Sequence, residues 1–124
     1  LEEALADLNR ARRMLELKDY SLSCYLSQQA LEKALKAVAI GLRRVRPPHT
    51  HDLTMLYEQV RDVLPISEEA VEALPEVSQY YVTARYPNAG IRRPSTSFSR
   101  VQALRALEVA EHVLERVRGA LHPG

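Results

Sequence analysis

The sequence predicts an all-α protein, an up-and-down bundle of four long helices plus a short fifth helix. Apolar residues recur at intervals of three and four positions through most of the chain, which is the period of an amphipathic helix. No segment shows the strict alternation of apolar and polar residues that marks a half-buried strand. Only four glycines occur in 124 residues, and the prolines fall between the periodic segments, as expected for helices with short connections.

Two uninterrupted helical patterns open the chain. Residues 1–17 carry one apolar stripe, formed by Leu1, Leu5, Leu8, Ala11 and Leu15. A second helix is predicted over residues 20–44, with Asp19 or Ser21 as its N-cap because both side chains can accept from free backbone N–H groups. The dipeptide Pro47-Pro48 ends this helix, since proline cannot continue the backbone hydrogen-bond pattern.

Four further helical segments are predicted in the rest of the chain. Thr50 or Asp52 caps the first of them, and Ser97 or Ser99 caps the last. Pro75 separates the two middle segments, as proline fits the first turn of a helix better than its interior. The segments cover residues 53–64, 67–74, 76–85 and 97–118, with one long irregular stretch at residues 86–96.

The composition predicts one domain, residues 1–124, in a reducing cytoplasm. No apolar run approaches the roughly 18 residues that cross a membrane, and no secretory signal is recognisable at the start. Cys24 is the single cysteine, which excludes an internal disulfide, and within a buried helix it is expected to act as a small core residue. A net charge of +1 argues against nucleic-acid binding driven by bulk charge.

The second helix is unusual because a polar stripe runs along an otherwise apolar surface. Leucine, alanine and valine cover most of its circumference, which predicts a central helix buried by several neighbours. Polar groups on such a helix need partners, since a buried unpaired amide or charge costs about 1–3 kcal/mol or more. The stripe therefore faces a wet groove, a partner or a structural network, and it consists of Tyr25, Gln28, Gln29, Glu32, Lys33 and Lys36.

Three motifs occur in order along the chain and together resemble the HEPN family, the helical nucleotide-binding domains of higher eukaryotes and prokaryotes. The resemblance extends from about residue 8 to residue 118. The motifs are Gln28-Gln29-Ala30-x-Glu32-Lys33-Ala34-x-Lys36-Ala37, Thr50-His51-Asp52-Leu53 and Tyr80-Tyr81-x-x-Ala84-Arg85-Tyr86-Pro87.

The resemblance implies a four- to five-helix bundle that forms a homodimer. Family members are often encoded beside a minimal nucleotidyltransferase, and many act in toxin–antitoxin or defence systems. We therefore expect a nucleotide- or RNA-binding module whose partner is a minimal nucleotidyltransferase. Its expected ligand-binding residues are Gln29, Glu32, Lys33, Tyr81, Arg85 and Tyr86.

Arg85 and Lys36 also have structural interpretations. Arg85 either holds a phosphate beside aromatic rings or pairs with Glu32 inside the bundle. Lys36 is expected to pair with Glu32 one helical turn away, a common interaction worth about 0.2–0.5 kcal/mol. Lys33 lies deeper in the apolar sequence and is the better site candidate.

The ribonuclease members of the family carry Arg, then four to six residues, then His, and their chemistry needs no metal because the RNA 2′-hydroxyl is the nucleophile. Arg85 has no histidine at that distance. Arg105 and His112 lie on one face of a long predicted helix, but the residues around them depart from the family pattern. Fourteen arginines make further matches of this spacing easy by chance: Arg44/His49, Arg46/His51 and Arg116/His122.

A metal-independent ribonuclease and a non-catalytic dimerisation scaffold stay as alternatives to the binding module. We expect no cofactor, because phosphate-binding loops and dinucleotide fingerprints are absent. His49 and His51 have metal-ligand side chains without enough companions for zinc, and His51 with Asp52 is expected to cap a helix. Arg43, Arg44 and Arg46 form a local basic cluster that either binds RNA phosphates or is a solvated helix end.

Overall fold

The computed structural model describes residues 1–84 and 98–123, and every secondary-structure element in these ranges is a helix. The α-helices are α1 (Glu2–Glu16), α2 (Tyr20–Val38), α3 (Leu53–Glu58), α4 (Glu68–Thr83) and α6 (Arg100–Leu121). A π-helical segment, η1 (Ala39–Arg43), extends α2. The all-α prediction is therefore confirmed.

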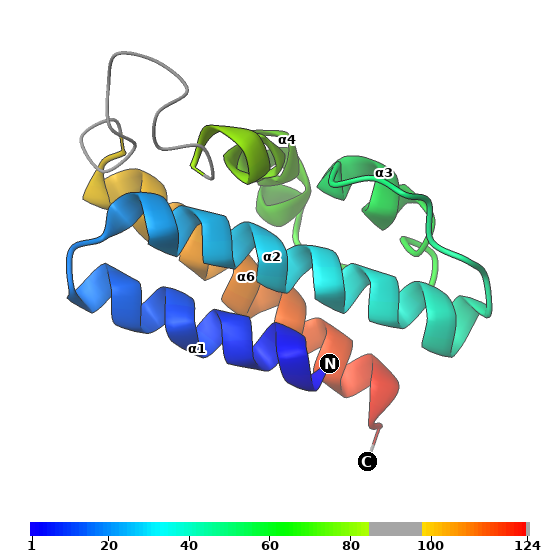
Figure 1. Cartoon of the computed structure of the whole chain (residues 1–124). Coiled ribbons are helices and arrows are strands. Elements are labelled where there is room, and N and C mark those ends of the chain that lie inside the picture. The colour runs from blue at the N-terminus through cyan, green and yellow to red at the C-terminus, as the bar shows by residue number, and fades with distance from the viewer. Residues whose placement is uncertain (85–97, 124) are drawn as a thin grey trace.

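Helix α2 is the central element. It contacts α1, α3, α4 and α6, and Figure 1 shows α1 and α3 on opposite sides of it. Its buried residues cover more than half of its circumference, and the remaining side is partly exposed at Tyr25, Gln29 and Lys33. Leu22 at its start and Leu42 in its π-helical extension are apolar but remain about two-fifths exposed. The core includes Leu31, Leu35, Leu56, Leu74 and Leu114.

The structure decides between the predicted caps. Asp19 accepts from the Leu22 N–H at the start of α2, and Asp52 accepts from the backbone N–H groups of Thr54 and Met55 at the start of α3. Ser99 forms a capping box with Gln102 at the start of α6. Ser97, the alternative cap, lies outside the described residues.

The predicted break at Pro75 is wrong, because α4 continues through this residue. Ala70, Leu74, Val77 and Tyr80 are all buried on one side of the helix. Their burial outweighs the cost of about 3 kcal/mol or more for a proline inside a helix. Pro75 itself is exposed, so its ring faces away from this core contact.

The third helix is also shorter than predicted, since α3 ends at Glu58 and turns follow to residue 63. The Tyr57 hydroxyl donates to the Leu64 carbonyl over 2.9 Å and closes this turn. Its five apolar residues are nevertheless buried as expected: Leu53, Leu56, Tyr57, Val60 and Leu64. The sequence pattern therefore predicts which of these residues are buried better than it predicts where the helix ends.

Candidate functional site

Glu32 lies at the centre of the polar stripe on α2, where its residue is only 7% exposed. One carboxylate oxygen accepts from Gln28 Nε2 over 3.0 Å and lies 2.8 Å from His51 Nδ1. The other oxygen pairs with Lys36 Nζ over 2.9 Å. These four residues, Gln28, Glu32, Lys36 and His51, form the Glu32 cluster.

The Glu32 carboxylate is held in its charged form. Burial raises its pKa, but hydrogen bonds from His51, Lys36 and Gln28 outweigh burial and leave the pKa below its ordinary value of 4.5. An ionised carboxylate only accepts hydrogen bonds, so His51 Nδ1 is the donor.

The His51 ring is fixed on both its edge and its face. It stacks on Tyr81 with ring centroids 3.5 Å apart and an interplanar angle of 11°. Tyr81 in turn lies 6.2 Å from the ring of Tyr25, another member of the polar stripe. The His51 carbonyl accepts from Gln28 Nε2, so the backbone is fixed as well. The His51 side chain nevertheless remains 48% exposed.

An open groove of about 660 Å³ adjoins this stacked pair. We call it the α3–α4 groove, because residues at the start of α3 and along α4 line it. Ser78 Oγ accepts from the Leu53 N–H over 2.8 Å and joins the two helices. The lining residues are Thr50, His51, Asp52, Thr54, Pro75, Ser78, Gln79, Tyr81 and Val82.

The expected ligand-binding residues do not all meet at this groove. Gln29 donates to Gln28 over 2.7 Å and so joins the Glu32 cluster at its edge. Lys33 instead pairs with Asp7 of α1 over 2.7 Å. Lys36 makes the one-turn pair with Glu32 that the sequence predicts. Arg85 and Tyr86 lie outside the described residues.

The sequence interpretation missed His51 as a member of the site. Its neighbour Asp52 alone caps α3, so the local cap explains the aspartate and not the histidine. Glu32 and His51 are 19 positions apart, and no local spacing indicates such a pair. The only sequence signal was that both residues belong to motifs of the family resemblance.

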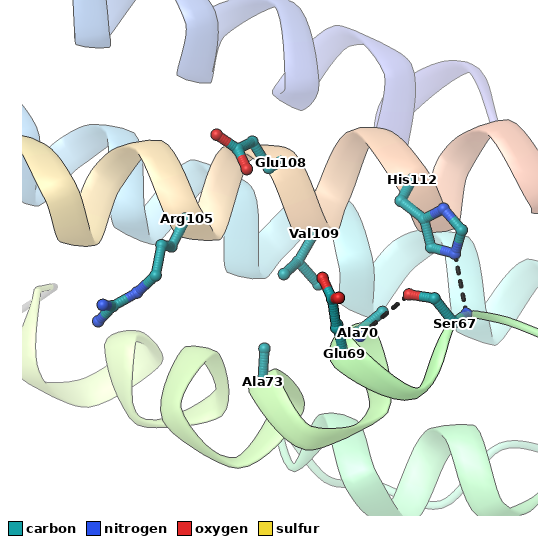
Figure 2. Close-up of a pocket in the computed structure, with 8 residues that line it drawn as sticks. All are labelled: Ser67, Glu69, Ala70, Ala73, Arg105, Glu108, Val109 and His112. Atoms are coloured by element: carbon teal, nitrogen blue, oxygen red, sulfur yellow. Dashed lines mark hydrogen bonds between the residues drawn. The ribbon is translucent and has the colours of Figure 1, made fainter.

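A second cavity, of about 340 Å³, lies between α4 and α6 and has Arg105 and His112 among its lining residues. We call it the α4–α6 pocket. Figure 2 shows the two side chains towards opposite ends of the pocket, with Val109 between them. His112 Nε2 accepts from the Ser67 N–H over 3.0 Å at the start of α4 (Figure 2). Arg105 pairs with Glu76 over 3.1 Å.

Both members of this Arg/His pair therefore have structural partners. Glu76 also accepts from the Tyr80 hydroxyl over 2.6 Å, so Arg105 belongs to a small network between α4 and α6. The hydrogen bond from Tyr80 is the main reason that the pKa of Glu76 is lowered. Burial opposes this shift, and the interaction with Arg105 adds to it. Arg105 and His112 therefore line the same cavity, but their side chains do not point at a common position.

The remaining side chains offer little further chemistry within the described ranges. Cys24 is fully buried, and burial together with the charge of Glu76 raises its pKa to about 12, so its thiol is inert. No group of three histidine, cysteine or acidic residues there is arranged to hold a metal ion. Among the described helices, none is both long and apolar enough to cross a membrane.

Comparisons with known proteins agree with this architecture. The HEPN domain family matches residues 1–120. The Methanocaldococcus jannaschii protein named "Putative toxin MJ1304" is 29% identical over 133 residues, which cover 98% of this chain and 85% of that protein.

Two solved structures share the fold. TT1696 from Thermus thermophilus matches with a TM-score of 0.82 at 31% identity, covering 97% of this chain and 94% of that one. ST0689, described as an archaeal HEPN homologue, matches with a TM-score of 0.75 at 23% identity, covering 97% and 93% of the two chains. The second likeness shows the fold alone.

Proposed function

Because the chain belongs to the HEPN domain family, we propose that it is the HEPN subunit of a toxin–antitoxin-type pair and binds a nucleotide or an RNA segment in the α3–α4 groove. The single observation that carries this proposal is the His51–Tyr81 stack, which is held rigid by Glu32 beside an open groove. Aromatic rings fixed in this way are suited to stacking on a nucleobase.

The groove offers both parts of a nucleotide site. Base stacking on an aromatic side chain is worth about 1–3 kcal/mol for each base and does not depend strongly on base identity. Ser78 and Gln79 place polar groups along the same wall, where they can hydrogen-bond to a base edge or a ribose. Arg85 and Tyr86, which follow α4 in the sequence, are proposed to complete the phosphate side.

The name of the archaeal relative, "Putative toxin MJ1304", supports the biological setting. The expected partner is a minimal nucleotidyltransferase, and the expected assembly contains two copies of this chain. Co-expression with an adjacently encoded nucleotidyltransferase, followed by measurement of the mass of the purified complex, tests both expectations. Separate elution of the two proteins would remove the partner from the proposal.

A metal-independent ribonuclease is the second candidate, because Arg105 and His112 line one pocket. We favour the binding module for a geometric reason. His112 Nε2 already accepts from Ser67 N–H, and Arg105 already pairs with Glu76. A ribonuclease needs its histidine nitrogen available for proton transfer and its arginine available for a phosphate.

Equilibrium binding of AMP, UMP and a short RNA in the presence of a chelator tests the proposed function. His51→Ala and Tyr81→Ala each remove one ring of the stack, and we expect about 5- to 100-fold weaker binding for a stacking loss of this kind. Arg85→Ala is expected to weaken binding while the protein stays helical.

Arg13→Ala is the matched control, since Arg13 is an exposed arginine on α1. Unchanged affinity in both ring variants would remove the α3–α4 groove from the proposal. Cleavage of the RNA that survives the chelator and is lost in His112→Ala would establish the ribonuclease instead.

A further inference from the structure

The segment between α2 and α3 has an uninterrupted positive character. Residues 39–51 contain three arginines and two histidines, and no aspartate or glutamate. The arginines Arg43, Arg44 and Arg46, which we call the arginine segment, are all exposed. This segment immediately precedes the part of the chain that contributes His51 to the α3–α4 groove.

The carboxylates nearby leave two of these arginines uncompensated. Arg43 pairs with Asp62 over 3.0 Å, whereas Arg44 and Arg46 have no ion pair among the described residues. Asp52 is used as the cap of α3, and Glu58 pairs with Arg61. Two positive charges therefore face solvent without a carboxylate that could offset them.

The backbone fixes where these charges lie. Arg44 follows the π-helical segment η1 and has φ 55°, in the left-handed region where glycine is usual. The Arg46 carbonyl accepts from Gln59 Nε2, and the His51 carbonyl accepts from Gln28 Nε2. The connection from the arginine segment to the groove is thus held at both ends.

The distance between the two regions suits a short strand of nucleic acid. His51 follows Arg46 by five positions, so the two residues lie at most about 18 Å apart at 3.3–3.6 Å per residue. A stacked strand that advances about 3.4 Å per nucleotide crosses this distance in about five nucleotides or fewer. Stacking rings beside a basic track are the combination by which proteins bind single strands.

We propose that the arginine segment is a phosphate-binding surface, and that the ligand of this protein is a single strand of several nucleotides rather than a free nucleotide. The phosphates on one side of the base that stacks on the outer face of the His51–Tyr81 pair cross Arg46 and then Arg44. The inference rests on the proposed function of the α3–α4 groove, and it assigns the class of ligand for that groove.

A nucleic acid fits this surface better than an acidic protein does. Ile40, the most exposed aliphatic residue of η1, lines a different hollow together with Glu2 and Glu3 of α1. The most exposed aliphatic side chain of this region therefore lies beside acidic residues, whereas Leu42 and Val45, next to the arginines, are 40% and 36% exposed. The arginines instead precede the aromatic pair along the chain.

The test compares an eight-nucleotide oligouridylate, its deoxythymidylate counterpart and UMP by equilibrium binding at several salt concentrations, with polyglutamate as a competitor. The double variant Arg44→Gln/Arg46→Gln removes the two uncompensated charges. The control Arg13→Gln/Lys18→Gln removes two exposed positive charges near the opposite end of α2. Arg46→Gln alone is measured as well, because Arg44 has unusual backbone geometry and its replacement could affect folding.

We expect the strands to bind more tightly than UMP. Each phosphate contact to a single strand contributes about 0.7 to the slope of log affinity against log salt, so the double variant should lower the slope by about 1.4. At 0.1 M salt this corresponds to roughly 25-fold weaker binding of both strands. UMP affinity should not change in the double variant, and the control should behave like the wild type.

Equal affinity for UMP and the strands, or equal strand affinity for the double variant and the control, would overturn this inference and leave the groove proposal intact. A loss confined to the ribose strand would overturn the assignment to phosphates. If polyglutamate displaces the strand when both are present at the same concentration of negative charges, the ligand would be an acidic protein instead. No binding of UMP or of either strand would overturn the proposed function itself.

Discussion

The Nδ1 nitrogen of His51 lies 2.8 Å from a carboxylate oxygen of Glu32, although the two residues are 19 positions apart. Glu32 belongs to the central helix, and His51 precedes α3. The pair therefore connects the most buried helix of the bundle to the wall of the α3–α4 groove. It explains how a side chain that is 48% exposed can have a fixed orientation.

Glu32→Ala should destabilise the protein. The substitution removes the acceptor of Lys36, of His51 and of one N–H of the fully buried Gln28 amide, whose nitrogen also donates to the His51 carbonyl. A buried donor without a partner costs about 1–3 kcal/mol, whereas Lys36 and His51 can be solvated. Urea denaturation should show a loss in this range. Equal stability of Glu32→Ala and wild type would mean that Glu32 does not hold the cluster together.

Stability should also depend on acid through Glu32. The lowered pKa of this carboxyl means that its contribution is fully present above the unfolded value of about 4.5 and is lost as the pH falls through the lower folded value. We expect the stability difference between wild type and Glu32→Gln to shrink below pH 4.5. Denaturation of both proteins between pH 3 and pH 6 measures it, and a difference that stays constant would contradict this origin.

Pro75→Ala should stabilise α4. Proline inside a helix lacks one backbone donor and costs about 3 kcal/mol, while alanine increases the freedom of the unfolded chain by about 0.4–1 kcal/mol. A net gain of about 2–2.6 kcal/mol is expected in urea denaturation. Glu72→Ala is the control, since Glu72 is exposed on the same helix. A loss of stability would show that the proline ring itself is needed where it lines the α3–α4 groove.

His112→Ala should change stability without changing ligand binding. The variant leaves the Ser67 N–H without its acceptor, and the loss of such a hydrogen bond costs about 1 kcal/mol. We expect no RNA cleavage in a chelator by the wild type, by this variant or by Arg105→Ala. Wild-type cleavage that either substitution abolishes would contradict the binding-module proposal.

The central position of α2 could be predicted because its apolar residues cover several faces of one continuous helix. The caps at Asp19, Asp52 and Ser99 were also accessible, since capping depends on residues within one turn. Pro75 misled the prediction because the burial of Leu74 and Val77, which keeps α4 continuous, depends on distant helices.

The candidate site could be predicted only in part. The polar stripe on α2 indicated that Gln29 and Glu32 need partners, and the one-turn spacing identified Lys36 as one of them. The stack of His51 on Tyr81 joins segments 30 positions apart, so no local pattern contains it. Lys33 pairs with Asp7 of α1, which packs against that side of α2. This contact also depends on tertiary structure and not on local sequence.

Mapping of UMP binding by two-dimensional NMR of the ¹⁵N-labelled protein tests the central claim most directly. The α3–α4 groove and the α4–α6 pocket are lined by different residues, so shifted amide signals distinguish them. We predict that the signals of His51, Gln79 and Tyr81 shift in proportion to bound nucleotide. Shifts confined to Ser67, Arg105 and His112 would place the ligand in the α4–α6 pocket and contradict the assignment of function to the His51–Tyr81 stack.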